Sequence, residues 1–240
     1  MIQHEIVSQT LSMLMVKAAI LAVATTLCAT AAAAKPHLIF VLADDFGYYD
    51  VSFRNPAAHT PHIDGLVAEG MELKRFYSYK FCSPTRCSLM SGRLPIHVNT
   101  ENNPTSKPGG VDLRMTLISE KLKAQGYFTG VSGKWHAGGH AAGQLPVQRG
   151  FDRSRVFLNG NEDHYSHYFG IDKGYDMWED GGNLYDNSTY GAELYVAHAL
   201  ATIAAFDPSQ PGHEALFMYV WRSTSRLLVV LSRRLQSYSH

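Results

Sequence analysis

The sequence predicts an α/β protein with a central, mostly parallel sheet, and three observations support this. Leu38 to Ala43 is a continuous apolar run with β-branched Ile39 and Val41, which is typical of a strand buried on both faces. Strand-like runs then alternate with amphipathic helical segments along the chain. Polar side chains follow several of these runs, at the strand ends where open α/β sheets bind ligands.

Length and composition set the bounds. The chain has 240 residues, enough for one sizeable domain, and its 45% apolar and 18% charged fractions are ordinary for a globular protein. Basic and acidic residues balance at 21 each, so we expect no nucleic-acid partner.

The N-terminus predicts a signal peptide over residues 1–34. Lys17 precedes an apolar run that ends in small residues, with Ala-x-Ala-type cleavage options between Ala29 and Ala34. An uncleaved membrane anchor is the alternative, but the run is shorter than the ~20 residues that a spanning helix needs, so no stable membrane span is expected. One acceptor for N-linked glycosylation, Asn187-Ser188-Thr189, fits a secretory route.

The first predicted strand ends in Asp44 and Asp45. Two adjacent carboxylates repel each other unless a cation neutralises them, and oxygen ligands of this kind suit Ca²⁺ or Mg²⁺. The alternative is a turn with two solvated aspartates.

The next segment predicts a helix and then a strand. Thr60 is a candidate N-cap with Pro61 at the first helical position, and Gly70 ends the helix. Met71 to Tyr77 then alternates as a short strand, which leads the chain to Cys82.

The stretch FCSPTRCSLMSGR, Phe81 to Arg93, contains the residues with the most chemical promise. Pro84 suits the first turn of a helix that Gly92 ends. Cys82 should therefore sit at a helix N-terminus, which favours an anion and hence a thiolate. Arg86 lies one turn further in, with a guanidinium suited to a tetrahedral oxyanion. Outside the signal segment Cys87 is the other cysteine, and the two could form a small disulfide or share a metal.

A third unit follows. Thr116 to Gln125 predicts an amphipathic helix, and the strand after it ends near Lys134 and His136, which point the same way if the strand continues. Residues 137–190 are loop-rich and suit either a sugar-binding cleft or a glycosylated surface excursion. The sequence then predicts a helix over Thr189 to Phe206 and a buried strand over Ala215 to Val220.

The pattern Cys82-x-Pro84-x-Arg86, extended through Gly92-Arg93, resembles the signature of the type I sulfatases. The stretches LIFVLADDFGYYDVSF, TPHIDGLVAEG, GYFTGVSGKWHAG and RGFD occur in the order found in that family. The resemblance covers Pro36 to about Val220, and the segment 186–190 with its following helix looks most like the arylsulfatase B branch.

The resemblance implies an alkaline-phosphatase-like sandwich, with residues 35–220 as the N-terminal part of the catalytic region. It implies that Asp44 and Asp45 bind a divalent cation, Ca²⁺ or Mg²⁺. It also implies that a formylglycine-generating enzyme converts Cys82 to formylglycine, which would touch the metal and act as the nucleophile.

Further roles carry over in the same way. Arg86 would stabilise the formylglycine hydrate, Lys134 would bind the sulfate and His136 would orient the hydrate. The implied activity is sulfuric ester hydrolysis on sulfated glycans or aryl sulfates, in the secretory pathway, with a lysosomal or extracellular destination.

Residues 221–240 depart from the family pattern. They hold four arginines, five serines and no acidic residue, which predicts an aberrant basic tail and a sheet that is incomplete at the C-terminus. We therefore expect an open apolar edge beside Ala215 to Val220. Two function classes stay open: an arylsulfatase B-like enzyme described by an incomplete chain, and a truncated secreted fragment without activity. For the chain as written we expect inactivity.

Overall fold

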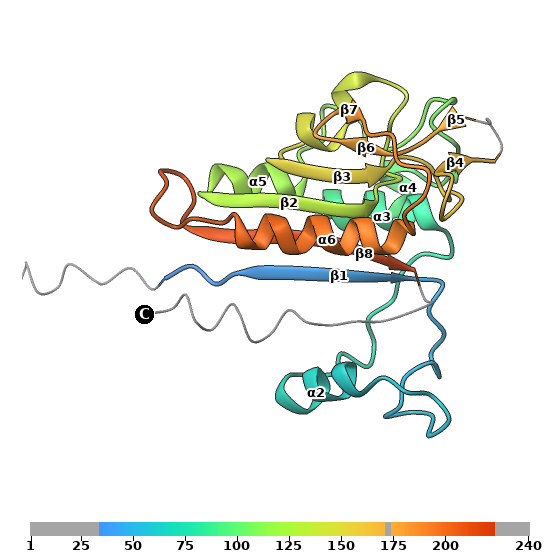
Figure 1. Cartoon of the computed structure of the whole chain (residues 1–240), viewed down its shortest axis with the longest axis vertical. Helices are drawn as coiled ribbons and strands as arrows, with labels where there is room; N and C mark the ends of the chain where they lie inside the picture. Colours follow the sequence, from blue (N-terminus) through green and yellow to red (C-terminus); the bar gives the residue numbers. More distant parts are fainter. Residues whose placement is uncertain (1–33, 171–173, 224–240) are drawn as a thin grey trace, which may run out of the picture. The chain divides into compact units, whose positions relative to one another are not determined.

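A six-stranded sheet lies at the centre of the computed structural model, which describes residues 34–170 and 174–223 (Figure 1). The strand order is β1-β8-β2-β3-β6-β7. The first four strands run parallel: β1 (Leu38–Asp44), β8 (Ala215–Ser223), β2 (Tyr127–Lys134) and β3 (Arg153–Phe157). The short strands β6 (Trp178–Glu179) and β7 (Gly182–Asn183) extend the sheet antiparallel. The predicted α/β class with a mostly parallel sheet is confirmed.

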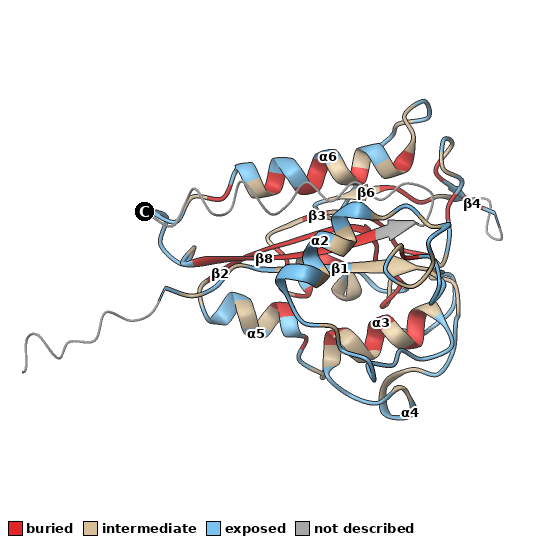
Figure 2. Ribbon diagram, turned by 90° about the horizontal axis from the view of Figure 1, so that it is seen from below, coloured by how far each residue is buried: buried red, intermediate tan, exposed pale blue. Residues whose placement is uncertain are grey.

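Helices cover both faces of this sheet. Figure 2 shows α6 (Gly191–Ala204) on one face, and α3 (Cys82–Ser91) with α5 (Ile118–Ala124) on the other. The remaining elements are short: α4 (Pro95–Val98), two 3₁₀ turns (Ala142–Gln144 and Pro146–Gln148), and the separate pair β4 (Tyr168–Phe169) and β5 (Gly174–Tyr175).

The core forms on both sides of β8. Phe217 and Tyr219 pack into the cluster on the α3 and α5 face, whereas Met218 packs against Ala199 of α6. Burial of each such side chain contributes about 1.5–3 kcal/mol relative to exposure. A continuous apolar run is therefore what a strand between two helical layers needs.

The strand predicted over Met71 to Tyr77 is not observed. Met71 to Tyr77 forms no strand, because its side chains are mostly exposed and no neighbouring strand among the described residues pairs with it. The helix before it, α2 (Pro61–Glu69), begins after Thr60 as predicted but has no buried residue. Alternation of apolar and polar residues is thus not enough to form a strand where there is no sheet to join.

The expected open edge beside Ala215 to Val220 is also wrong. In the register of the sheet, Tyr219 lies between Phe40 of β1 and Val131 of β2, so β8 is an interior strand. Within the described residues the edge strands of this sheet are β1 and β7, and Leu38 and Val41 of β1 are 36% and 41% exposed. β1 is therefore not buried on both faces, because the last strand inserts between the first two parallel units and leaves β1 outermost.

The ends of the chain are only partly covered. Most of the predicted signal peptide, residues 1–33, and most of the predicted tail, residues 224–240, lie outside the described residues. β8 runs on to Ser223 and so includes Trp221, which the sequence places in the tail. Within 34–170 and 174–223, no helix has the length and apolar character needed to cross a bilayer.

Candidate active site

The residues predicted from sequence meet at the carboxyl edge of the sheet. Asp44 is the last residue of β1, Lys134 is the last residue of β2, and Cys82 is the first residue of α3. Parallel strands end at the same edge of a sheet, so loops that follow separate strands bring their side chains together there.

Asp44 is the centre of this group. Lys134 Nζ donates a hydrogen bond to Asp44 Oδ2 at 2.8 Å, Trp221 Nε1 donates to the same oxygen at 3.0 Å, and the Arg86 guanidinium lies 3.6 Å from it. The Cys82 Sγ lies 3.8 Å from the other oxygen, Oδ1. Burial alone would raise the pKa of Asp44, but the charges of Lys134 and Arg86 outweigh it and the pKa lies below its ordinary value. The carboxylate is therefore ionised at neutral pH.

Arg86 is held rigidly inside the protein. Its side chain is 1% exposed, and Nη1 donates to the Lys134 carbonyl oxygen and to the Tyr219 hydroxyl, both at 2.8 Å. Its Nε is buried and has no hydrogen-bond partner among the described residues. The guanidinium is thus fixed in position next to Asp44 before any ligand binds.

His136 takes a different direction from the one that a continued strand would give it. β2 ends at Lys134, and His136 has a φ of 45°. Its ring lies against Gly160, where an added Cβ would approach the ring to 2.9 Å. Its Nε2 lies 3.3 Å from the Asn103 carbonyl oxygen, and its buried Nδ1 has no partner in the described parts of the chain. Burial, assisted by the charge of Lys134, lowers the pKa of His136 to about 4, so the ring is neutral.

A cavity of about 570 Å³ opens next to this group. Its walls include four predicted site residues and three aromatic side chains: Asp44, Asp45, Cys82, Arg86, Phe46, Tyr79 and Phe81. Lys134 and His136 do not line it, and they are 2% and 3% exposed. Four of the residues predicted from sequence thus line the cavity, whereas Lys134 and His136 are buried and do not line it.

The start of α3 sets the position of Cys82. The Ser83 N–H donates to Asn102 Oδ1 at 3.0 Å, and Gly92 closes the helix with a φ of 67°. Cys82 and Cys87 are both free thiols, so the alternative of a disulfide between them is wrong. Cys87 is fully buried, and this burial raises the pKa of its thiol. The two cysteines therefore have different environments within one helix.

A divalent cation finds only part of a site here. Asp44 Oδ1 and the carboxylate of Asp45, an exposed residue with a φ of 52°, are available at the cavity. Ca²⁺ takes six to eight oxygen ligands. No cluster of three or more His, Cys, Asp or Glu residues suited to a metal occurs within the described ranges. The chemistry of the two carboxylates suits a hard cation, but these residues alone do not complete its coordination.

Sequence reasoning missed two contributors from β8. Tyr219 supports Arg86, and Trp221 contacts Asp44 while packing against Phe157 with ring centroids 5.0 Å apart. The sequence indicated only that these two residues lie at or just after the end of a predicted strand. Neighbouring residues do not reveal that this strand pairs with β1.

Comparisons with a family model and with curated proteins both match this chain to sulfatases. A family model described as Sulfatase matches residues 36–201. The chain is 36% identical over 200 residues to arylsulfatase J of Mus musculus, a match that covers 80% of this chain and 32% of the relative. It is 31% identical over 218 residues to N-acetylgalactosamine-6-sulfatase of Mus musculus, with coverages of 81% and 40%.

A solved structure agrees with these matches. The structure of Ps i-CgsB in complex with k-i-k-neocarrahexaose has a TM-score of 0.65 and 26% identity, over 80% of this chain and 46% of that one. The chain thus spans less than half the length of each of these proteins. The particular resemblance to arylsulfatase B stays a prediction.

Proposed function

Because the chain belongs to the sulfatase family and has its alkaline-phosphatase-like α/β fold, we propose that it serves the hydrolysis of sulfate esters. The observation that carries this proposal is the position of Cys82, which begins α3 at the cavity wall beside Asp44 and Arg86. One relative is named as an N-acetylgalactosamine-6-sulfatase, which supports sulfated glycans as the substrate class alongside simple aryl sulfates. An arylsulfatase B-like specificity is part of the proposal.

The proposed nucleophile derives from Cys82. A formylglycine-generating enzyme converts the cysteine in the secretory pathway, and the hydrated aldehyde then supplies an oxygen nucleophile toward sulfur. The N-terminus of α3 favours negative charge at this position. Arg86 adds a guanidinium that Lys134 and Tyr219 already hold in place. Donors fixed in advance stabilise developing charge without reorganising during the reaction.

His136 is proposed to act as a neutral hydrogen-bond acceptor. A neutral imidazole has one N–H and one bare nitrogen. Since a carbonyl oxygen accepts hydrogen bonds and cannot donate them, Nε2 carries the proton toward Asn103, and Nδ1 is the bare nitrogen. An unpaired acceptor of this kind suits the orientation of a hydroxyl group.

Lys134 is proposed to bind the sulfate group. Its ammonium is buried against Asp44, so it reaches a ligand in the cavity only when that contact is shared or replaced. Asp44, Asp45 and the converted Cys82 would contribute to holding Ca²⁺ or Mg²⁺, which neutralises charge on sulfate oxygens. These residues supply only part of the six to eight oxygen ligands that Ca²⁺ takes.

A second candidate is a secreted chain that binds the maturation enzyme or a sulfated glycan without turnover. The observation that favours it is the small number of carboxylates at the cavity, which are Asp44 and Asp45. Conversion of Cys82 is expected for both candidates, so turnover separates them.

The test uses secreted full-length chain made together with a formylglycine-generating enzyme. Mass spectrometry of the tryptic peptide Phe81–Arg86 should show an aldehyde in place of the Cys82 thiol. Cys87 starts the next tryptic peptide and is the internal control, because it lies buried in the same helix and should stay a thiol. Unmodified Cys82 in secreted protein would overturn the proposed nucleophile. Assay on a chromogenic aryl sulfate, with Cys82→Ala as the blank, then distinguishes enzyme from binder.

A further inference from the structure

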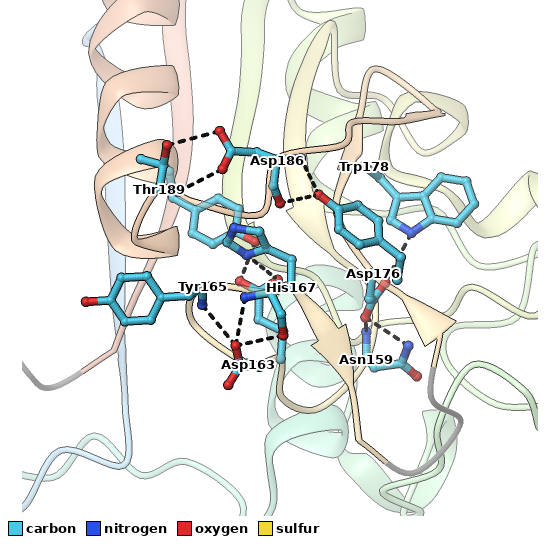
Figure 3. A network of polar contacts seen from close by, with 12 residues as sticks. Asn159, Asp163, Tyr165, His167, Asp176, Trp178, Asp186 and Thr189 are labelled. Carbon is cyan, nitrogen blue, oxygen red and sulfur yellow. Dashed lines mark hydrogen bonds and ion pairs between the residues drawn. The ribbon is translucent and has the colours of Figure 1, made fainter.

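The loop between β7 and α6 has a well-defined shape. The Asp186 carboxylate accepts hydrogen bonds from the Ser188 and Thr189 N–H groups at 3.0 and 2.8 Å, and from Thr189 Oγ1 at 3.0 Å (Figure 3). The backbone of Asp186 is fixed as well, since its N–H donates to the Tyr175 hydroxyl at 2.6 Å and that hydroxyl donates to its carbonyl at 2.8 Å. The loop is therefore anchored on both sides of Asn187.

Asn187 itself is exposed at the tip of this anchored loop. With Ser188 and Thr189 it forms an Asn-x-Thr acceptor, the sequence that an oligosaccharyltransferase recognises in the secretory route. A bulky sugar at this side chain would displace no packed group, because neither Asn187 nor Ser188 is buried.

Tyr185, two residues before Asn187, is an exposed aromatic residue. Its side chain is 74% exposed, and its ring stacks on Tyr175 with centroids 4.8 Å apart and an angle of 29° between the planes. One face of the ring is thus covered and the opposite face is open. Aromatic rings contribute large apolar contact surfaces at little entropic cost, and the apolar face of a sugar ring is a suitable partner.

We propose that Asn187 carries an N-linked glycan whose first sugar packs on the open face of Tyr185. This rests on the secretory route of the proposed function, but not on catalysis. In the transfer, the side-chain nitrogen of Asn187 bonds to C1 of an oligosaccharide carried on a lipid pyrophosphate. The bond from C1 to the pyrophosphate oxygen breaks, the lipid pyrophosphate leaves, and the amide nitrogen gives up one proton.

The order of events also follows from the loop. In the folded chain the Thr189 hydroxyl donates a hydrogen bond to the Asp186 carboxylate, so this hydroxyl is not free for the oligosaccharyltransferase to recognise. Transfer therefore precedes closure of the loop, during translocation of the nascent chain, and the folded protein is a poor acceptor.

The first experiment is translation of the full chain with microsomal membranes, followed by a peptide N-glycosidase. One glycan should appear on the protease-protected chain and be absent in Asn187→Gln. Asn183→Gln is the matched control from the end of β7, since Asn183 is exposed but is followed two positions later by Tyr185 and not by Ser or Thr, and this variant should keep the glycan. A second arm replaces residues 1–34 by the signal peptide of a known secreted protein. In that arm, translocated chain without glycan overturns the proposal whatever happens at Cys82.

The second experiment tests the contact with Tyr185. Enzymatic deglycosylation of the secreted protein should lower Tm by about 2–4 °C, the shift that one ordinary interaction gives in a domain of this size. In Tyr185→Ala the glycan should still attach, but its removal should change Tm by less than about 1 °C. Tyr49→Ala is the control, because Tyr49 is 63% exposed and lies in another loop. Equal Tm shifts in all three proteins would refute the packing of the sugar on Tyr185.

Discussion

Replacement of Trp221 by Phe tests whether the end of β8 belongs to the candidate active site. Trp221 is 7% exposed, donates to Asp44 Oδ2 at 3.0 Å, and packs between Phe157 and Tyr195. Phenylalanine keeps an aromatic ring in this cluster but removes the N–H and part of the ring system. The substitution therefore separates the polar contact from most of the packing.

The expected loss comes from two sources. A hydrogen bond to a charged group contributes about 1.5–3 kcal/mol net. Asp44 keeps Lys134 as a partner at 2.8 Å, so no buried charge is left alone and the larger penalty for an orphaned carboxylate does not apply. The smaller ring adds about 1 kcal/mol for lost packing. The free energy of unfolding should fall by about 2.5–4 kcal/mol, which lowers Tm by roughly 5–16 °C.

Urea unfolding followed by far-UV circular dichroism measures this without relying on the fluorescence of the residue removed. Trp178→Phe is the matched control, because its indole donates to the carboxylate of Asp176 at 3.1 Å, away from Asp44. Both variants should lose stability. Titration of Asp44 by NMR should show its pKa rising only in Trp221→Phe, since that variant loses a donor to the ionised carboxylate. A loss below about 0.5 kcal/mol for Trp221→Phe, with an unchanged Asp44 pKa, would refute the contact.

Three further predictions concern charge and catalysis. Burial would lower the pKa of His167, but the Glu162 carboxylate 3.5 Å away outweighs it, and with smaller help from the charge of Asp186 the pKa is raised. Protonated His167 therefore stabilises the fold below a pH of about 6.5, and this contribution is lost as pH rises through the raised pKa. In urea titrations, His167→Gln should lower the free energy of unfolding more at about pH 5.5 than at about pH 8.5. Equal losses at both pH values would contradict this. Asp45→Asn should weaken Ca²⁺ binding by about tenfold or more in calorimetry, because it removes a charged oxygen ligand, and an unchanged affinity would remove Asp45 from the cation site. The 240-residue chain with Cys82 converted should show little turnover of an aryl sulfate, because among the described residues the cavity offers a divalent cation only the carboxylates of Asp44 and Asp45, whereas Ca²⁺ takes six to eight oxygen ligands. Ready turnover of the aryl sulfate, well above that of the Cys82→Ala blank, would contradict it.

Local sequence patterns predicted the elements that pack on both sides of the sheet. The helix expected over Thr116 to Gln125 is observed as Ile118–Ala124, and the one expected over Thr189 to Phe206 is observed as Gly191–Ala204. Apolar periodicity and helix-ending residues fix such elements, because both act over a few neighbouring residues. The expected strand over Met71 to Tyr77 had the right periodicity but no partner, and periodicity does not report a partner.

The candidate site was predictable to the same extent. Asp44, Cys82 and Lys134 each end a strand or begin a helix, and the geometry of parallel sheets is sufficient to bring such positions together. Trp221 was not predictable, because its contact with Asp44 depends on β8 inserting next to β1, which lies about 180 positions earlier in the chain. No local pattern contains that pairing.

The charges around Cys82 explain why this group of residues suits an anion. Two buried cations, Arg86 and Lys134, face one partly buried carboxylate, that of Asp44, while the neutral ring of His136 adds no charge. Asp45 is exposed, so solvent and salt screen its charge far more than the others. The buried part of the site, next to the first turn of α3, therefore has two positive charges and one negative charge, which leaves a net charge of one positive unit. A sulfate group in the cavity would supply the missing negative charge, and any cation that binds Asp44 would free Lys134 from that carboxylate and increase the positive excess.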